Sequence, residues 1–240
     1  MWEYVLLGIA QGVFEWIPIS SEGVVALMSQ FLVKDFNPVD VALFLHLGTL
    51  LSVLIYFYKD FIDLILIKDK DFFKFFVIVT IISGAIGFFI YQFASGVAMG
   101  SGLLFLMGIG LLFTSFMQKK KISVNKKYSE IVVGILQGIS AIPGVSRSGS
   151  TIFGLSLFEK DPELILKYSY LISAPVVFGS SLYLFIKNPV FIFNGGWIAL
   201  IFSFIFGILS LKIILNWAKK IDFSLFTFIF AIICLIGAML

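Results

Sequence analysis

Four residues that can do chemistry lie inside long apolar stretches of this 240-residue sequence: Glu15, Glu22, His46 and Arg147. Nearly all other charged residues stand between the apolar stretches or at their ends. An ionised glutamate or arginine at the depth of a lipid bilayer costs about 2.5–3.5 kcal/mol or more, so it is functional by default and needs a partner. We therefore expect Arg147 to lie opposite Glu15 and Glu22. A structural ion pair that only locks two parts of the chain together is the alternative.

Hydroxyl side chains accompany these charges, in Ser20-Ser21 and in the run from Ser146 to Thr151. Each group precedes an apolar stretch, where a serine can cap a helix. The exposed N–H groups and the positive dipole end of such a helix bind phosphate, and the fork of guanidinium donors on Arg147 suits phosphate oxygens. The candidate phosphate-binding residues are Ser20, Ser146, Ser148, Gly149 and Thr151.

Glu15 and Glu22 cannot bind a phosphate directly, but they can hold a divalent cation that bridges to it. Carboxylate oxygens are the ligands that Mg²⁺ and Ca²⁺ prefer. The metal and Arg147 would together neutralise charge on a phosphoryl group during its transfer. These residue types predict a diphosphate site within a membrane.

The composition identifies the class of protein. Apolar residues make up 60% of the chain and charged residues 13%, against about 45–50% and 25% in soluble domains. This excludes a soluble enzyme, a disordered chain and a nucleic-acid partner, and it predicts an all-α integral membrane protein.

A membrane-spanning helix needs about 20 apolar residues. Six uninterrupted spans are expected, at residues 41–58, 72–93, 98–117, 164–186, 197–215 and 223–240. Stretches 1–33 and 129–158 are each broken by proline, glycine, serine and a charge. Such breaks persist only where protein or water surrounds the backbone, so we expect two re-entrant hairpins of half-helices. Two kinked full spans in each stretch are the alternative.

The lysines indicate how the spans are oriented. With six crossings, 14 of the 16 lysines fall on one side, and only Lys34 and Lys187 fall on the other. The positive-inside rule makes the lysine-rich side cytoplasmic. The first hairpin then opens from outside and the second from inside, and we expect an extracytoplasmic active site. Two full spans in each stretch would give the same sides.

The two broken stretches also resemble each other. Gly8, Gln11 and Gly12 correspond to Gly134, Gln137 and Gly138 at an offset of 126 residues, and a proline followed by serines and a glycine comes next in both. Three spans, an odd number, follow each hairpin, so the second copy is inverted. We expect one membrane domain, 1–240, with repeat halves at about 1–120 and 128–240 and a site between them.

The same two motifs resemble those of the undecaprenyl-diphosphate phosphatases. Gln11 to Gly23 is similar to the family's E/Q-x-x-x-E and P-x-S-S-x-G signature, and Pro143 to Gly149 is similar to its P-G-x-S-R-S-G. The resemblance implies hydrolysis of a long-chain polyprenyl diphosphate to the monophosphate and phosphate in the cell membrane. This reaction recycles a lipid carrier for cell-wall or glycan assembly, and bacitracin resistance follows in bacteria.

The resemblance also assigns residues. Gln11 and Glu15 hold the positions of the acidic motif, Arg147 that of the phosphate-binding arginine, and Ser21 that of a nucleophile. Val24 stands where many bacterial members carry a histidine considered important for catalysis. His46 or Glu22 can take its part; otherwise His46 is an ordinary helix residue that is hydrogen-bonded within the bundle.

Two other functions compete with hydrolysis. A carrier-lipid flippase or transporter would use the same head-group site, and the inverted repeat favours it. An ion channel or a structural membrane protein is the weaker option, because the buried Arg147 with its flanking glycines and serines argues against it. A homodimer is compatible with the sequence.

Overall fold

The computed structural model describes residues 1–17, 19–97, 101–119, 126–142, 144–187, 192–217 and 223–239. Every regular element within these ranges is helical, which confirms the all-α class. The elements are α1 (Trp2–Phe14), α2 (Ser21–Leu32), α3 (Pro38–Tyr56), α4 (Tyr58–Ile65), α5 (Lys70–Val97), α6 (Ser101–Lys119), η1 (Lys126–Tyr128), α7 (Ser129–Ile139), α8 (Arg147–Ser156), α9 (Pro162–Lys187), η2 (Ile192–Gly196), α10 (Trp197–Trp217) and α11 (Phe223–Met239).

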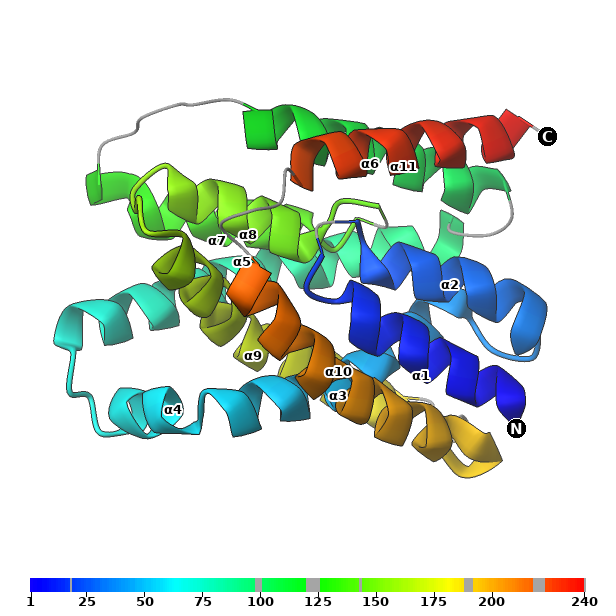
Figure 1. The fold of residues 1–240 in the computed structure, drawn as a ribbon, viewed down its shortest axis with the longest axis horizontal. Coiled ribbons are helices and arrows are strands. Elements are labelled where there is room, and N and C mark those ends of the chain that lie inside the picture. The colour runs from blue at the N-terminus through cyan, green and yellow to red at the C-terminus, as the bar shows by residue number, and fades with distance from the viewer. Residues whose placement is uncertain are drawn as a thin grey trace.

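Long apolar helices make this an integral membrane protein. Among the described residues, four segments are long and apolar enough to cross a membrane: Pro38–Tyr56, Lys70–Gln92, Pro162–Ile186 and Asn194–Asn216. They coincide with four of the six predicted spans. The other two fall on α6 and α11, which pack along each other (Figure 1), and their crossing of the membrane stays a prediction. Residues 98–100 and 240 of these predicted spans lie outside the described residues.

Two helical hairpins meet end to end in the middle of the molecule. α1 turns back into α2 and α7 turns back into α8, with the two turns facing each other (Figure 1). The amide N of Gly144 donates a hydrogen bond to Ser20 Oγ at 3.2 Å, and Ser148 Oγ donates to the carbonyl of Ile17 at 3.3 Å. Pro18 and Pro143, which interrupt the apolar stretches in the sequence, lie outside the described residues.

The second arm of each hairpin starts at a serine cap. Ser20 Oγ accepts from the amide of Gly23 at 3.3 Å, and Ser146 Oγ accepts from the amide of Gly149 at 3.2 Å. Ser20 has a φ of 62°, in the left-handed region, which reverses the chain immediately before α2. Both helix N-termini therefore point into the centre, as the serine pattern predicts.

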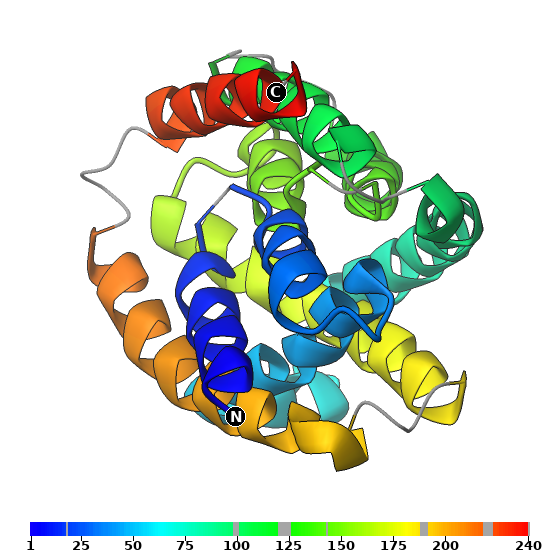
Figure 2. The same ribbon diagram turned by 90° about the vertical axis from the view of Figure 1, so that its right-hand side faces the viewer.

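Glycines let each hairpin approach a long helix closely. A Cβ on Gly12 of α1 would lie 2.7 Å from the amide N of Gly207 on α10. A Cβ on Gly138 of α7 would lie 2.6 Å from Cβ of Ile86 on α5. Small residues at helix contacts allow this packing inside a bilayer. Viewed end-on, the α1–α2 hairpin lies near the centre of the bundle (Figure 2).

The pair α3 and α10 is joined by buried polar contacts. Ser203 Oγ donates to the carbonyl of Leu45 at 3.0 Å, and Ser52 Oγ donates to the carbonyl of Phe204 at 3.0 Å. Gly48 of α3 has no room for a side chain, since a Cβ there would lie 2.6 Å from Cβ of Ser203. These contacts fix α3, the helix that carries His46, against its neighbour.

Candidate active site

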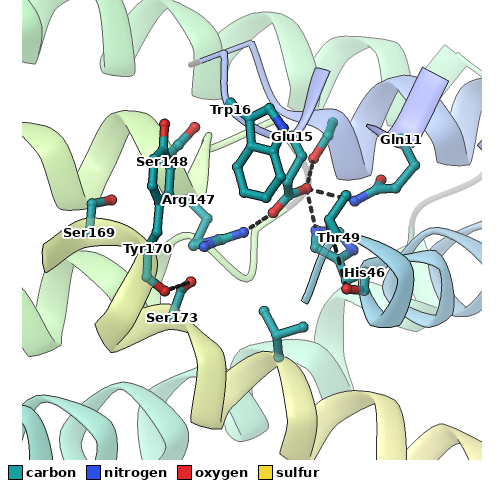
Figure 3. A network of polar contacts seen from close by, with 12 residues as sticks. Gln11, Glu15, Trp16, His46, Thr49, Arg147, Ser148, Ser169, Tyr170 and Ser173 are labelled. Atoms are coloured by element: carbon teal, nitrogen blue, oxygen red, sulfur yellow. Dashed lines mark hydrogen bonds and ion pairs between the residues drawn. The ribbon is translucent and has the colours of Figure 1, made fainter. Parts of the chain in front are cut away.

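Glu15 is the centre of the polar network between the two hairpins. It follows the last residue of α1 and is only 3% exposed. Its Oε2 accepts hydrogen bonds from Gln11 Nε2 and from Ser21 Oγ, each at 2.6 Å (Figure 3). Gln11 is one helical turn earlier, where the i, i+4 spacing places both side chains on one face. The motif residues Gln11, Glu15 and Ser21 thus form one cluster.

Two basic side chains from other helices complete the shell of Glu15. Nη2 of Arg147, the first residue of α8, forms an ion pair with Glu15 Oε1, and Nε2 of His46 on α3 lies 3.1 Å from Oε2 (Figure 3). The predicted pairing of Arg147 with Glu15 is therefore present. Together with Gln11 and Ser21, four side chains surround this one carboxylate.

The orientation of His46 fixes where its proton lies. Its Nδ1 is 2.8 Å from the carbonyl oxygen of Ala42, which can only accept, so Nδ1 carries a hydrogen. A neutral ring would then present a bare nitrogen to the oxygens of Glu15. Nε2 of a neutral ring can then take up a proton that Glu15 has accepted, because Nε2 and Oε2 lie 3.1 Å apart. His46 and Glu15 are therefore placed to exchange a proton.

The remaining hydroxyl candidates occupy two kinds of position. Ser20, Ser146 and Ser148 lie at the meeting point of the hairpins, with Ser146 Oγ and Ser148 Oγ 3.2 Å apart. Gly149 donates its amide to the cap of α8. Thr151 lies further along α8, where its hydroxyl contacts the carbonyl of Arg147 at 2.9 Å and the hydroxyl of Ser169 on α9. The hydroxyl of Thr151 thus links α8 to α9.

A cavity of about 310 Å³ borders this network. Glu22, His46 and Arg147 line it, together with hydroxyls such as that of Ser173. Within the part of the chain that the structure describes, the buried Nη1 of Arg147 has no hydrogen-bond partner. A buried guanidinium nitrogen is costly to leave unpaired, so the cavity beside Arg147 suits an anionic oxygen ligand.

The carboxylates fit a divalent cation unequally. The carboxylate of Glu15 is surrounded by four side chains, so it binds a metal only if one of these moves away. Glu22 faces the cavity instead. In the described ranges, no cluster of three or more His, Cys, Asp or Glu residues could hold a metal. One carboxylate is nevertheless enough for Mg²⁺ when substrate phosphates supply the other ligands.

Comparison with known proteins places the chain in a family. The family model described as bacitracin resistance protein BacA matches residues 4–237, which is nearly the whole sequence. The chain belongs to the BacA family. This confirms the family expected from the two motifs.

Related proteins in the BacA family support the match over the full length. A relative from Methanococcoides burtonii, named undecaprenyl-diphosphatase, is 32% identical over 93% of each chain. One of the same name from Aquifex aeolicus is 31% identical over 99% of this chain and 97% of its own length. A third, from Halothermothrix orenii, is 35% identical over 76% of this chain and 73% of its own length.

Sequence reasoning missed two aromatic residues beside the site. Trp16, directly after Glu15, is 1% exposed and donates from Nε1 to the carbonyl of Gly207 and to Ser210 Oγ, both at 2.9 Å. Its ring meets that of Tyr170 edge to face, with centroids 5.1 Å apart. These contacts hold the turn that carries Glu15. Nothing in the spacing distinguishes Trp16 or Tyr170 from other apolar residues of this aromatic-rich chain.

Proposed function

We propose that this protein of the BacA family is a phosphatase for a long-chain polyprenyl diphosphate, which it hydrolyses to the monophosphate and inorganic phosphate. One observation carries the proposal: Arg147 is held at the meeting point of the hairpins by Glu15 while its Nη1 is left for a ligand. The relatives named undecaprenyl-diphosphatase support the same reaction. Recycling of a lipid carrier for cell-wall or glycan assembly would follow.

The arrangement suggests a role for each side chain. Arg147 binds the terminal phosphate and neutralises the charge that develops on it. Glu15 accepts the proton of Ser21 Oγ, which lies 2.6 Å away and is the nearest candidate to attack the terminal phosphorus. The phosphoanhydride bond breaks as the polyprenyl monophosphate leaves, and water then hydrolyses the phosphoserine to free Ser21 and inorganic phosphate. Through Nε2, His46 shares the proton that Glu15 accepts, and so serves in place of the histidine that other members carry at the position of Val24. Gln11 holds the Glu15 carboxylate in place.

We further propose that a divalent cation, Mg²⁺ or Ca²⁺, binds between Glu22 and the diphosphate. The fit rests on Glu22 being the carboxylate at the cavity wall beside Arg147 and His46. The cation would neutralise phosphate charge and bring the diphosphate close to Glu22. Glu15, surrounded by four side chains, would remain in its role toward the nucleophile.

The hairpins are proposed to be re-entrant halves of an inverted repeat with six crossings in all. The equivalent close contacts of Gly12 on α10 and Gly138 on α5 support this arrangement. The cavity is lined by α5 from Thr80 onward and by α9 from Ser173 onward, far from the lysines at the starts of both helices. With the lysine-rich side cytoplasmic, the site opens to the extracytoplasmic side.

Phosphate release from detergent-solubilised protein tests the reaction. Wild-type protein should release phosphate from undecaprenyl diphosphate only with a divalent cation. Glu15→Gln, which keeps the shape of the side chain, should lose about a thousandfold in rate or more. Hydrolysis needs no second compartment, whereas transport does. Lipid binding without phosphate release would overturn the proposal and favour the carrier-lipid flippase.

A further inference from the structure

The cavity beside the candidate active site has both charged and apolar groups in its wall. Glu22, His46 and Arg147 are its charged and basic lining residues. Most of the other lining residues belong to α5 and α9, where apolar residues such as Phe88 and Val176 alternate with hydroxyls such as that of Ser173. A ligand that fills such a cavity carries an anionic group at one end and an apolar body behind it.

The apolar part reaches the outside of the protein between α5 and α9. Its rim includes Phe88, which is 47% exposed, and Tyr183, which is 39% exposed. The two rings meet edge to face with centroids 6.0 Å apart. Because both helices are long and apolar enough to span a membrane, this rim faces lipid.

Two glycines keep this route clear of side chains. Gly84 on α5 and Gly179 on α9 both line the cavity, and a Cβ on either would meet no other atom within 4 Å. Elsewhere in the chain, glycines bring helices into contact, as Gly12 does between α1 and α10. Gly84 and Gly179 therefore border open space and do not lie in a close helix contact. We call the part of the cavity lined by Gly84, Phe88, Gly179 and Tyr183 the α5–α9 opening.

The other half of the molecule is closed at the related position. In the inverted repeat α10 corresponds to α5 and α3 to α9, so α3–α10 is the counterpart of α5–α9. Two serine hydrogen bonds of 3.0 Å join α3 to α10, and Gly48 lies directly against Ser203. The α5–α9 pair is thus open where its counterpart, α3–α10, is closed. The open pair borders the cavity that Arg147 and His46 line.

We propose that the α5–α9 opening is the channel through which the isoprenoid chain of the lipid substrate passes from the diphosphate site into the bilayer. The inference rests on the proposed phosphatase function and adds to it the path of the hydrocarbon chain. A flexible unsaturated chain can lie over the glycine surfaces between the rings of Phe88 and Tyr183. Lateral access of this kind lets the head group reach Arg147 while the hydrocarbon stays in lipid.

Filling the opening tests the proposal. Gly84→Leu and Gly179→Leu each place a branched side chain in open space, so both should fold and purify like the wild type. We expect each to lower kcat/KM for undecaprenyl diphosphate about tenfold or more, and to leave that for the short farnesyl diphosphate within about twofold. The matched control is Ala85→Leu, which adds the same bulk at the neighbouring exposed position of α5, outside the cavity lining.

The outcomes distinguish a failure of the proposed phosphatase function from a failure of the proposed path for the isoprenoid chain. If wild-type protein hydrolyses neither substrate, the proposed function fails. If wild-type protein is active and the leucine variants keep its preference for the long substrate, the α5–α9 opening is not the chain's path. Equal loss of both substrates also overturns the inference, since it would place these glycines at the head-group end.

A second measurement uses the unaltered protein and so does not depend on how the variants fold. A polyprenyl diphosphate with a photoreactive group in its first isoprene units should cross-link to peptides of α5 or α9. Excess unlabelled undecaprenyl diphosphate should suppress this cross-linking. Cross-links confined to α3 and α10, or to α6 and α11, would contradict the proposed path.

Discussion

Arg147, the first residue of the second arm of the α7–α8 hairpin, forms an ion pair with Glu15 in the turn of the α1–α2 hairpin. The pair joins the two halves of the chain at their meeting point. Burial of two charges costs several kcal/mol, which a structural contact alone recovers poorly. Among the described residues Nη1 of Arg147 has no hydrogen-bond partner, which is consistent with the proposal that the pair receives a phosphate as a third charged group.

Replacement of Arg147 by lysine should separate the effect of its positive charge on turnover from the effect of its planar guanidinium group. Arg147→Lys keeps a cation beside Glu15 but loses the planar fork, so we expect kcat to fall by about 100-fold or more. Arg147→Ala should also destabilise the protein, by about 3–5 kcal/mol, because it removes the ion-pair partner of the buried Glu15 carboxylate. Phosphate release and thermal unfolding in detergent measure the two effects.

The control for Arg147 is a second ion pair in the same protein. Lys167 on α9 pairs with Asp60 on α4, away from the cavity lining and partly exposed. Lys167→Ala should leave phosphate release close to the wild-type rate, since exposed pairs contribute about 1 kcal/mol or less. Near-wild-type turnover of Arg147→Lys would show that Arg147 acts as a point charge and that its planar fork is not needed to contact Glu15 and phosphate at the same time.

His46 should be essential because it is placed to exchange a proton with Glu15. We expect His46→Ala to lower kcat about 100-fold with little change in KM, since general acid–base groups contribute about that much. Val24→His, added to His46→Ala, returns a histidine to the position where many family members carry it. Recovery of a substantial part of kcat in the double variant would show that the histidine has moved within the site. Full activity of His46→Ala would show that His46 only packs within the helix bundle and takes no part in proton transfer.

The sequence predicted much of this site because the informative residues were local. Serine caps, broken apolar stretches and a lone arginine at depth were enough to bring Glu15, Ser21 and Arg147 together. The contact of His46 with Glu15 could not be predicted, because it depends on which face of α3 turns inward. That orientation comes from the packing of Gly48 against Ser203, a contact between distant segments that no local pattern encodes.

The same reasoning explains the other gaps between sequence and structure. Thr151 belongs to the serine-rich motif, yet the helical register turns its hydroxyl toward Ser169. Glu15 and Glu22 look equivalent as carboxylates, but the turn between them directs one into the donor cluster and the other toward the cavity. The α5–α9 opening is a property of helix pairing and leaves only two glycines as its trace in the sequence.

Metal dependence should distinguish the two glutamates. Glu22→Gln is expected to raise the Mg²⁺ or Ca²⁺ concentration needed for half-maximal rate by about tenfold or more. Activity should return at high metal concentration, because the loss of one ligand weakens metal binding without removing the reacting groups. Glu15→Gln should stay inactive at any metal concentration. Chelation with EDTA should abolish wild-type turnover reversibly. The reverse pattern, with Glu15→Gln rescued by metal, would make Glu15 the metal ligand.

Cysteine labelling in intact cells tests the orientation on which the extracytoplasmic site depends. The buried native Cys234 is first replaced by serine, which gives a background without reactive thiols. Lys126→Cys, at an exposed position before the second hairpin, should react with a membrane-impermeant maleimide only after the cells are opened. Lys34→Cys, exposed after the first hairpin, should react in intact cells. Labelling of both from one side would require an even number of crossings between them and would end the six-span arrangement. Reversal of the two results would keep the arrangement but turn the cavity toward the cytoplasm, so that the lipid carrier would be dephosphorylated on the inner face.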